Sequence, residues 1–191
     1  MVQNPYQNAL LPAPVGGGYS DPDYWIWCGS VVQGEDGAYH MFASRWPKDL
    51  GFGANWLFNC EIVRASSKNP EGPYTFQEVV LGRRGRTFFE GMNVHNPYIR
   101  KWNKTYYLYY MGTTFGGPIP GPGDEVDSSR FTEVWNRKRI GLATAPSVFG
   151  PWTRCDEPLI SPRDCSHWDC TATTNPAVAI QPDGTTYMLY K

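Results

Sequence analysis

The sequence predicts an all-β fold made of β-propeller blades, and three observations support this prediction. Short runs rich in aromatic and β-branched residues alternate with glycine, proline and asparagine, which is the pattern of short strands joined by turns. Long amphipathic helical patterns are absent. The third observation is an internal repeat, and self-similarity at a fixed spacing marks architectures built from repeated supersecondary units.

The repeat is clearest in segments that share a Gly-Pro-aromatic signature. Ile62–Ala65 recurs as Ile140–Ala143, and the following Gly72–Tyr74 recurs as Gly150–Trp152, in both cases 78 residues later. A second repeated pair, 79 residues apart, comprises His95–Ile99 and Thr174–Val178. A more degenerate copy precedes both.

Each full unit is predicted to contain four short strands, which in the second unit lie near 94–100, 105–111, 138–144 and 151–155. Four antiparallel strands per repeat describe a propeller blade, whereas a two-sheet sandwich, the alternative, does not explain an aligned repeat. The chain 1–191 is thus one partial propeller domain, with blades at about 23–81 and about 90–160 and the start of a third at about 169–191. Propellers close with roughly four to eight blades. We therefore expect these two and a half blades to belong to a larger ring, completed by the rest of the gene or by another chain.

The composition excludes several classes of function. The formal net charge is -1, so the chain lacks the basic surface that nucleic-acid binding requires. No stretch approaches the roughly 18 apolar residues of a membrane-spanning helix, so no membrane partner is expected. The N-terminal segment lacks the charged and apolar regions of a secretion signal. Localisation stays open, with a secreted or periplasmic location favoured.

Metal and cofactor signals are also missing from the sequence. The five cysteines are an odd number and include no CxxC pair. His167 lies between Cys165 and Cys170, but four ligands at zinc spacing are not present, so no metal site is predicted. No sequence pattern indicates a cofactor, and none indicates a calcium ion in the central channel.

Blade topology determines which loops share a face of the propeller. The turns between the first and second strands are short and polar, as at Glu35–Gly37, Trp102–Lys104 and Pro182–Gly184. The opposite face receives two unusual loops, Arg45–Trp56 and the long Gly/Pro-rich stretch Gly112–Asn136. Because loops of this length usually have a function, we expect the active site on their face.

Three carboxylates occupy one register in the predicted repeat. Asp23, Glu90 and Asp169 each fall six residues before the aligned start of an inner strand. They are expected to converge on one rim of the propeller, where neighbouring acids could supply the acid and the base or nucleophile of glycoside hydrolysis. The alternative is that a repeated acid only braces the same loop in each blade.

His95 begins an inner strand, and its counterpart in the third unit is Thr174, so the repeat itself does not require a histidine. Its functional interpretation is acid-base catalysis or hydrogen bonding to substrate, and the alternative is a structural channel histidine. Arg45 follows a second strand and could bind a carboxylate. The remaining predicted substrate-binding residues are Trp46, Trp56, Asn96 and Asn175.

With these residues in view, the chain resembles the five-bladed propeller glycosidases of glycoside hydrolase families 43 and 117, as a divergent and truncated member. The resemblance rests on Asn96–Ile99 with Tyr106–Tyr110, and on Ile140–Ala143 with Gly150–Trp152. It implies a propeller fold and a carbohydrate substrate. Family 43 members carry an acid in an Asp-Pro-like element at the start of their inner strands, and here the equivalent positions read Gly29-Ser30, Asn96-Pro97 and Asn175-Pro176.

The functional prediction is therefore a glycoside hydrolase, exo-acting on an oligo- or polysaccharide, with the three carboxylates and His95 as candidate catalytic groups. Two alternatives stay open. One is a propeller polysaccharide lyase that uses His95 with a tyrosine and an arginine on a uronate-containing glycan. The other is a non-catalytic glycan-binding propeller, in which Trp46 and Trp56 would bind the sugar.

Overall fold

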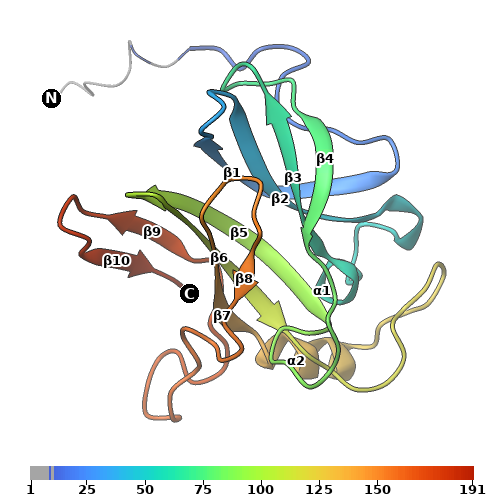
Figure 1. The fold of residues 1–191 in the computed structure, drawn as a ribbon. Helices are drawn as coiled ribbons and strands as arrows, with labels where there is room; N and C mark the ends of the chain where they lie inside the picture. The colour runs from blue at the N-terminus through green and yellow to red at the C-terminus, as the bar shows by residue number, and fades with distance from the viewer. Residues whose placement is uncertain (1–8, 10) are drawn as a thin grey trace, which may run out of the picture.

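In a computed structural model, which describes residue 9 and residues 11–191, the chain forms three antiparallel sheets (Figure 1). The first sheet has the order β1 (Tyr24–Gln33), β2 (Tyr39–Pro47), β3 (Glu61–Ser67) and β4 (Thr75–Leu81). The second has the order β5 (Asn93–Trp102), β6 (Thr105–Thr113), β7 (Arg139–Ala145) and β8 (Thr153–Arg154). The third pairs β9 (Ala177–Ile180) with β10 (Thr186–Leu189). The predicted four-stranded antiparallel blades are thus confirmed.

Helical segments occur in the loops between the second and third strands. They are η1 (Lys48–Leu50) and α1 (Trp56–Asn59) in the first blade and α2 (Ser128–Asn136) in the second. The sequence predicted only an irregular loop where α2 lies. Asp127 caps this helix by accepting a hydrogen bond from the backbone N–H of Arg130 at 2.9 Å. Val134, on the same helix, is buried. No helix in the described part of the chain is long and apolar enough to cross a membrane.

The inner strands β1, β5 and β9 lie next to one another, and hydrogen bonds between blades hold them in register. Ser30 on β1 accepts a bond from the backbone N–H of Ile99 on β5 at 3.1 Å. Arg100 on β5 donates from Nε to the carbonyl of Val178 on β9 at 2.8 Å. Successive blades are thus fixed to one another at their inner strands, with β5 between the first sheet and the β9–β10 pair (Figure 1).

A kink with one left-handed residue lies within β1, within β5 and just before β9. The φ angles are 52° at Cys28, 51° at Asn96 and 53° at Asn175, and asparagine tolerates this region better than most residues. At the first two kinks the pairing with the next strand shifts register, as in a β-bulge. The sequence aligned Gly29 with Asn96, whereas the bulges show that Cys28 is the equivalent residue.

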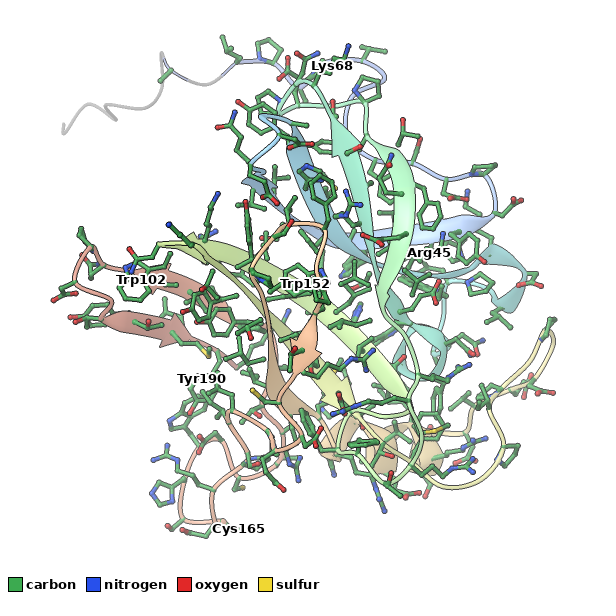
Figure 2. All side chains as sticks on the ribbon, in the orientation of Figure 1. Arg45, Lys68, Trp102, Trp152, Cys165 and Tyr190 are labelled. Atoms are coloured by element: carbon green, nitrogen blue, oxygen red, sulfur yellow. The ribbon has the colours of Figure 1, made fainter. Side chains whose placement is uncertain are left out.

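The main core lies between the first two blades. Its buried members come from both sheets and include Phe42, Ile62, Leu81, Ile99, Leu108 and Ala143. Trp152, labelled in Figure 2, belongs to the repeated Gly-Pro-aromatic signature and packs edge-on against Phe42 with ring centroids 5.3 Å apart. The signature in the second blade is therefore a contact between blades, which explains why an aromatic residue stands there.

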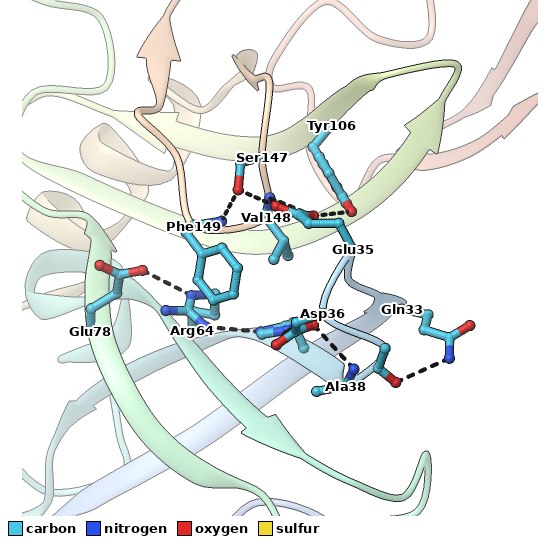
Figure 3. Close-up of polar contacts among 12 residues, drawn as sticks. Gln33, Glu35, Asp36, Ala38, Arg64, Glu78, Tyr106, Ser147, Val148 and Phe149 are labelled. Carbon is cyan, nitrogen blue, oxygen red and sulfur yellow. Dashed lines mark hydrogen bonds and ion pairs between the residues drawn. The ribbon is translucent and has the colours of Figure 1, made fainter.

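The face opposite the long loops carries a polar connection between blades (Figure 3). Glu35, in the β1–β2 turn, accepts hydrogen bonds from Tyr106 at 2.7 Å, from the backbone N–H of Val148 at 3.2 Å, and from Ser147. Burial opposes ionisation of Glu35, but the bonds from Ser147 and Tyr106 outweigh it and lower its pKa to about 2. A turn that the sequence predicted to serve only for chain reversal therefore also joins the blades.

Candidate functional site

A pocket of about 290 Å³ lies on the face that receives the long loops, as the sequence predicted. It is lined by Trp27, Trp46, Phe52, Trp56, His95, Asn96, Trp135, Lys138, Thr174, Asn175 and Lys191. Five of the nine predicted site residues are among them: His95, Trp46, Trp56, Asn96 and Asn175.

The kinks at the inner strands build the base of this pocket. Trp27, His95 and Thr174 directly precede the left-handed residues of the three blades, and all three line the pocket. A kink at the same register on each blade therefore directs three different side chains to one place. Of the three, only His95 is ionisable, which agrees with its selection from the sequence.

Aromatic rings form much of the pocket wall. Trp46 is almost fully buried and donates from Nε1 to the carbonyl of Gly51 at 3.2 Å. Trp56 on α1 and Trp135 on α2 contact each other edge-on, with centroids 5.8 Å apart. Sugar rings bind well to indole faces, because these combine a large apolar area with a polar edge. The helices in the long loops thus provide a surface suited to a carbohydrate.

His95 is 3% exposed and lies between two of these indoles. Its ring centroid is 5.0 Å from that of Trp56 and 6.4 Å from that of Trp46. Its Nδ1 is buried without a hydrogen-bond partner, and the residue lines the pocket. Burial, together with the nearby charge of Lys138, lowers the pKa of His95 to about 3, so the ring is neutral at physiological pH.

Lys138 immediately precedes β7, and its side chain is 1% exposed. Its ammonium lies over indole rings, 2.8 Å from the centroid of Trp135 and 5.9 Å from that of Trp56. Burial, reinforced by repulsion from Lys191, lowers its pKa to about 7. No Asp or Glu lines this pocket, so the ammonium has no carboxylate beside it there.

The two asparagines play different local roles. The backbone N–H of Asn96 donates to Oγ of Ser44 at 2.9 Å, while its Oδ1 is buried without a partner. Oδ1 of Asn175 accepts from Oγ1 of Thr174 at 3.0 Å. Both asparagines take the left-handed kink, so part of their role is conformational, and both also border the pocket.

The three predicted carboxylates do not line this pocket. Glu90 is fully buried against Arg84, whose Nη2 lies 2.7 Å from its Oε1, and against Arg154 at 3.6 Å. Tyr110 donates a further hydrogen bond to the same oxygen at 3.4 Å. Gly112 leaves room for it, because a Cβ there would come within 2.0 Å of the Glu90 Cβ.

Asp169 repeats this arrangement in the third unit. Its carboxylate accepts from Nε of Arg163 at 2.8 Å and from Tyr190 at 2.7 Å. Burial opposes ionisation of Asp169, but the bonds from Tyr190 and Arg163 outweigh it and lower its pKa. The arginine precedes the acid by six residues in both units, as in Arg84 and Glu90. This geometry favours the bracing interpretation for both acids.

Asp23 and Arg45 also lie away from the pocket. Asp23 is exposed, in a separate depression that it shares with Lys48 and Asp49. Arg45, labelled on the first blade in Figure 2, donates from Nε to Glu61 at 2.8 Å and stacks on the ring of Tyr24 at 4.0 Å. The expectation that Arg45 and the three acids gather around one site is therefore corrected. Arginines hold Glu90 and Asp169, Glu61 holds Arg45, and Asp23 lies in its own depression.

Sequence reasoning missed six residues of the pocket: Trp27, Phe52, Trp135, Lys138, Thr174 and Lys191. One of them had a readable signal. At the repeat spacing of 78 residues, Lys138 corresponds to Cys60, which is buried in the first blade. A lysine at a position that the repeat keeps buried is a candidate for function.

The geometry also bears on the metal and lyase interpretations. Within residues 9 and 11–191, no group of three or more His, Cys, Asp or Glu side chains is arranged to hold a metal ion. The lyase alternative required a tyrosine and an arginine beside His95, and neither residue type lines the pocket.

Comparison with known proteins gives results at the level of structure only. No family model matches the chain, and no curated protein matches it by sequence. Among solved structures, a family 117 glycoside hydrolase from the marine bacterium Zobellia galactanivorans superposes with a TM-score of 0.65 at 20% identity, over 88% of this chain and 48% of that chain.

Two other enzymes superpose as well, and the first of them is a family 43 glycoside hydrolase. A β-xylosidase/α-arabinofuranosidase from a compost microbial metagenome gives a TM-score of 0.56 at 20% identity, covering 87% of this chain and 42% of that one. An exo-1,5-α-L-arabinanase from a bovine ruminal metagenomic library gives 0.53 at 18% identity, covering 87% and 46%. The chain has the propeller fold of family 117 and family 43 glycoside hydrolases. At these identities the likeness shows the fold alone.

This glycoside hydrolase propeller fold confirms the resemblance that the repeated motifs predicted. The chain spans less than half the length of each of these three structures. At the positions where the sequence departs from the family 43 pattern, Asn96 and Asn175 adopt left-handed kinks.

Proposed function

We propose that this propeller belongs to an exo-acting glycoside hydrolase that binds a terminal sugar in the pocket around His95. The observation that carries the proposal is an indole-lined pocket, on the face of the long loops, in a glycoside hydrolase fold. A pocket of about 290 Å³ has room for the end of a glycan.

His95 is the residue that we propose to contact the reacting sugar. Because its pKa is about 3, the imidazole is neutral at pH 7 and suited to hydrogen bonding a sugar hydroxyl rather than to donating the proton of an imidazolium. Trp56 holds the ring in place from one side. The indoles would stack on the sugar and exclude water from it.

Glycoside hydrolysis ordinarily uses two carboxylates that flank the bond, and no Asp or Glu lines this pocket. This observation favours one second candidate, the non-catalytic glycan-binding propeller. In both functions the described residues bind and orient a sugar. The two differ in whether bound sugar is turned over.

The test is hydrolysis of a panel of nitrophenyl glycosides and natural oligosaccharides by this chain, with products separated by chromatography. We expect release of a single terminal sugar, and His95→Ala should lower kcat/KM by about tenfold through loss of one hydrogen bond to the sugar. His167→Ala is the matched control, because His167 lies on an exposed loop beside Asp164 and Ser166.

Wild-type turnover by the His95 variant would contradict the assigned role. Sugar binding without turnover on any substrate would support the glycan-binding candidate instead.

A further inference from the structure

Lys138 has no role in the binding of a neutral sugar by His95 and the indoles. It is a charged group, 1% exposed, in the wall of a pocket made mostly of indoles. Enclosing a charge is costly unless an opposite charge or several hydrogen bonds accompany it. Here the ammonium contacts the faces of Trp135 and Trp56, which offer cation–π attraction but no oxygen acceptor.

The groups around Lys138 increase the free-energy cost of burying its charge. The charged or titratable groups that face it are His95 from β5 and Lys191 after β10. No carboxylate is among them. The pKa of Lys138 is lowered for the same reason, since burial and the charge of Lys191 both disfavour its charged form.

The repeat shows that the fold does not require a lysine at this position. The equivalent residue of the first blade is Cys60, which is buried and uncharged, and whose backbone N–H donates to Oδ1 of Asn93 at 2.7 Å. An uncharged side chain therefore suffices for the structural role. A lysine that costs stability points to a ligand that supplies the missing negative charge.

We infer that the pocket selects an anionic sugar, one that carries a carboxylate or a sulfate group, and that Lys138 binds this group. This inference rests on the proposed function and names its substrate class. The indoles of Trp56 and Trp135 would stack on the sugar ring while the ammonium pairs with the anionic oxygens. Such charge-assisted hydrogen bonds are strong in a site that excludes water.

The test is calorimetric titration of this chain with sugars matched in ring and differing only in charge. One series is D-galactose, D-galacturonic acid and D-galactose 6-sulfate, and a parallel series uses the corresponding glucose derivatives. At pH 6.5 we expect at least one anionic sugar to bind about tenfold more tightly than its neutral counterpart. The carboxylate and sulfate arms show which anion the site takes.

Two variants isolate the role of Lys138. Lys138→Met should abolish the preference for the anionic sugar while binding of the neutral sugar is kept, because the indole walls stay in place. Lys104→Met, in the β5–β6 turn on the opposite face, removes the same net charge and should leave the preference intact. Both variants are expected to fold, since one removes an enclosed charge and the other a surface charge.

The pH dependence gives an independent readout. Lys138 has a pKa of about 7 in the free protein, so its affinity for the anionic sugar should fall as pH rises from 7 to 9. His95, with a pKa of about 3, stays neutral over that range. Affinity for the neutral sugar should be unchanged.

Equal affinity for neutral and anionic sugars would overturn this inference and leave the proposed function standing. Persistence of the anionic preference in Lys138→Met would also overturn it. If inorganic sulfate bound as tightly as the sulfated sugar, the site would be a simple ion site and the inference would again fail. Binding of no sugar at all would contradict both the inference and the proposed function.

Discussion

Replacing Glu90 with glutamine is expected to lower the free energy of unfolding by about 3 kcal/mol, because the change removes the charge from a buried ion pair. Glu90 is 0% exposed, and Arg84 and Arg154 both point at its Oε1. Gln has nearly the same shape, so the loss would come from charge rather than from packing. Denaturant unfolding followed by fluorescence measures the effect.

The control for this prediction is Glu133→Gln. Glu133 also pairs with an arginine, Arg137, at 3.0 Å, but the two side chains are 55% and 50% exposed. Exposed pairs of this kind contribute less than about 1 kcal/mol. If Glu90→Gln kept wild-type stability and lost turnover, the bracing interpretation would be contradicted and the catalytic role first expected for Glu90 would be restored.

Replacing Trp56 with alanine is expected to weaken sugar binding by about tenfold or more, since one stacking face and its apolar area are lost. Trp56 contacts two other residues that line the pocket. It lies against His95 on one side, and its indole edge meets Trp135 at 5.8 Å on another. Its loss would remove a sugar contact and release His95.

Titration of the Trp56→Ala and Trp56→Phe variants with sugar separates these two effects. Phe restores an aromatic face and should recover part of the affinity. Trp168→Ala is the control, because Trp168 is 68% exposed and stacks on Tyr190 rather than on the pocket. Unchanged affinity in Trp56→Ala would show that the sugar does not bind among these indoles.

Much of the fold could be predicted because the blades share one pattern of core residues. Ile62 and Ile140, at equivalent positions of β3 and β7, are both fully buried. A repeat of this kind constrains strand order and loop faces together. It therefore located the pocket face, and it singled out His95 as a departure from the repeat. Helix α2 could not be predicted from the sequence, because it is short and depends on its Asp127 cap and on packing.

The carboxylates show how a repeat can mislead. Glu90 and Asp169 are equivalent, as their spacing indicated, and each is held by an arginine six residues earlier. Arg84 and Arg163 are themselves 79 residues apart, so the sequence contained evidence for bracing. A shared acid together with a shared basic partner indicates a structural unit, whereas His95 and Lys138 have no such partner.

The pocket walls could be predicted only in part. Trp46 and Trp56 lie in a loop whose length drew attention to it, but Trp135 lies on α2, within a stretch that was expected to be irregular. The contact between Lys138 and the two indoles joins α1, α2 and the start of β7. Contacts of this kind depend on how the loops fold back over the blade, and no local sequence pattern records that.

The most direct test of a sugar site at His95 is nuclear magnetic resonance of the protein with ¹⁵N-labelled histidine rings. The chain has three histidines, and His40 and His167 lie outside the pocket. We predict that a bound sugar shifts the ring nitrogen signals of His95 and leaves those of the other two unchanged. A sugar that binds without moving the His95 signals would contradict the account.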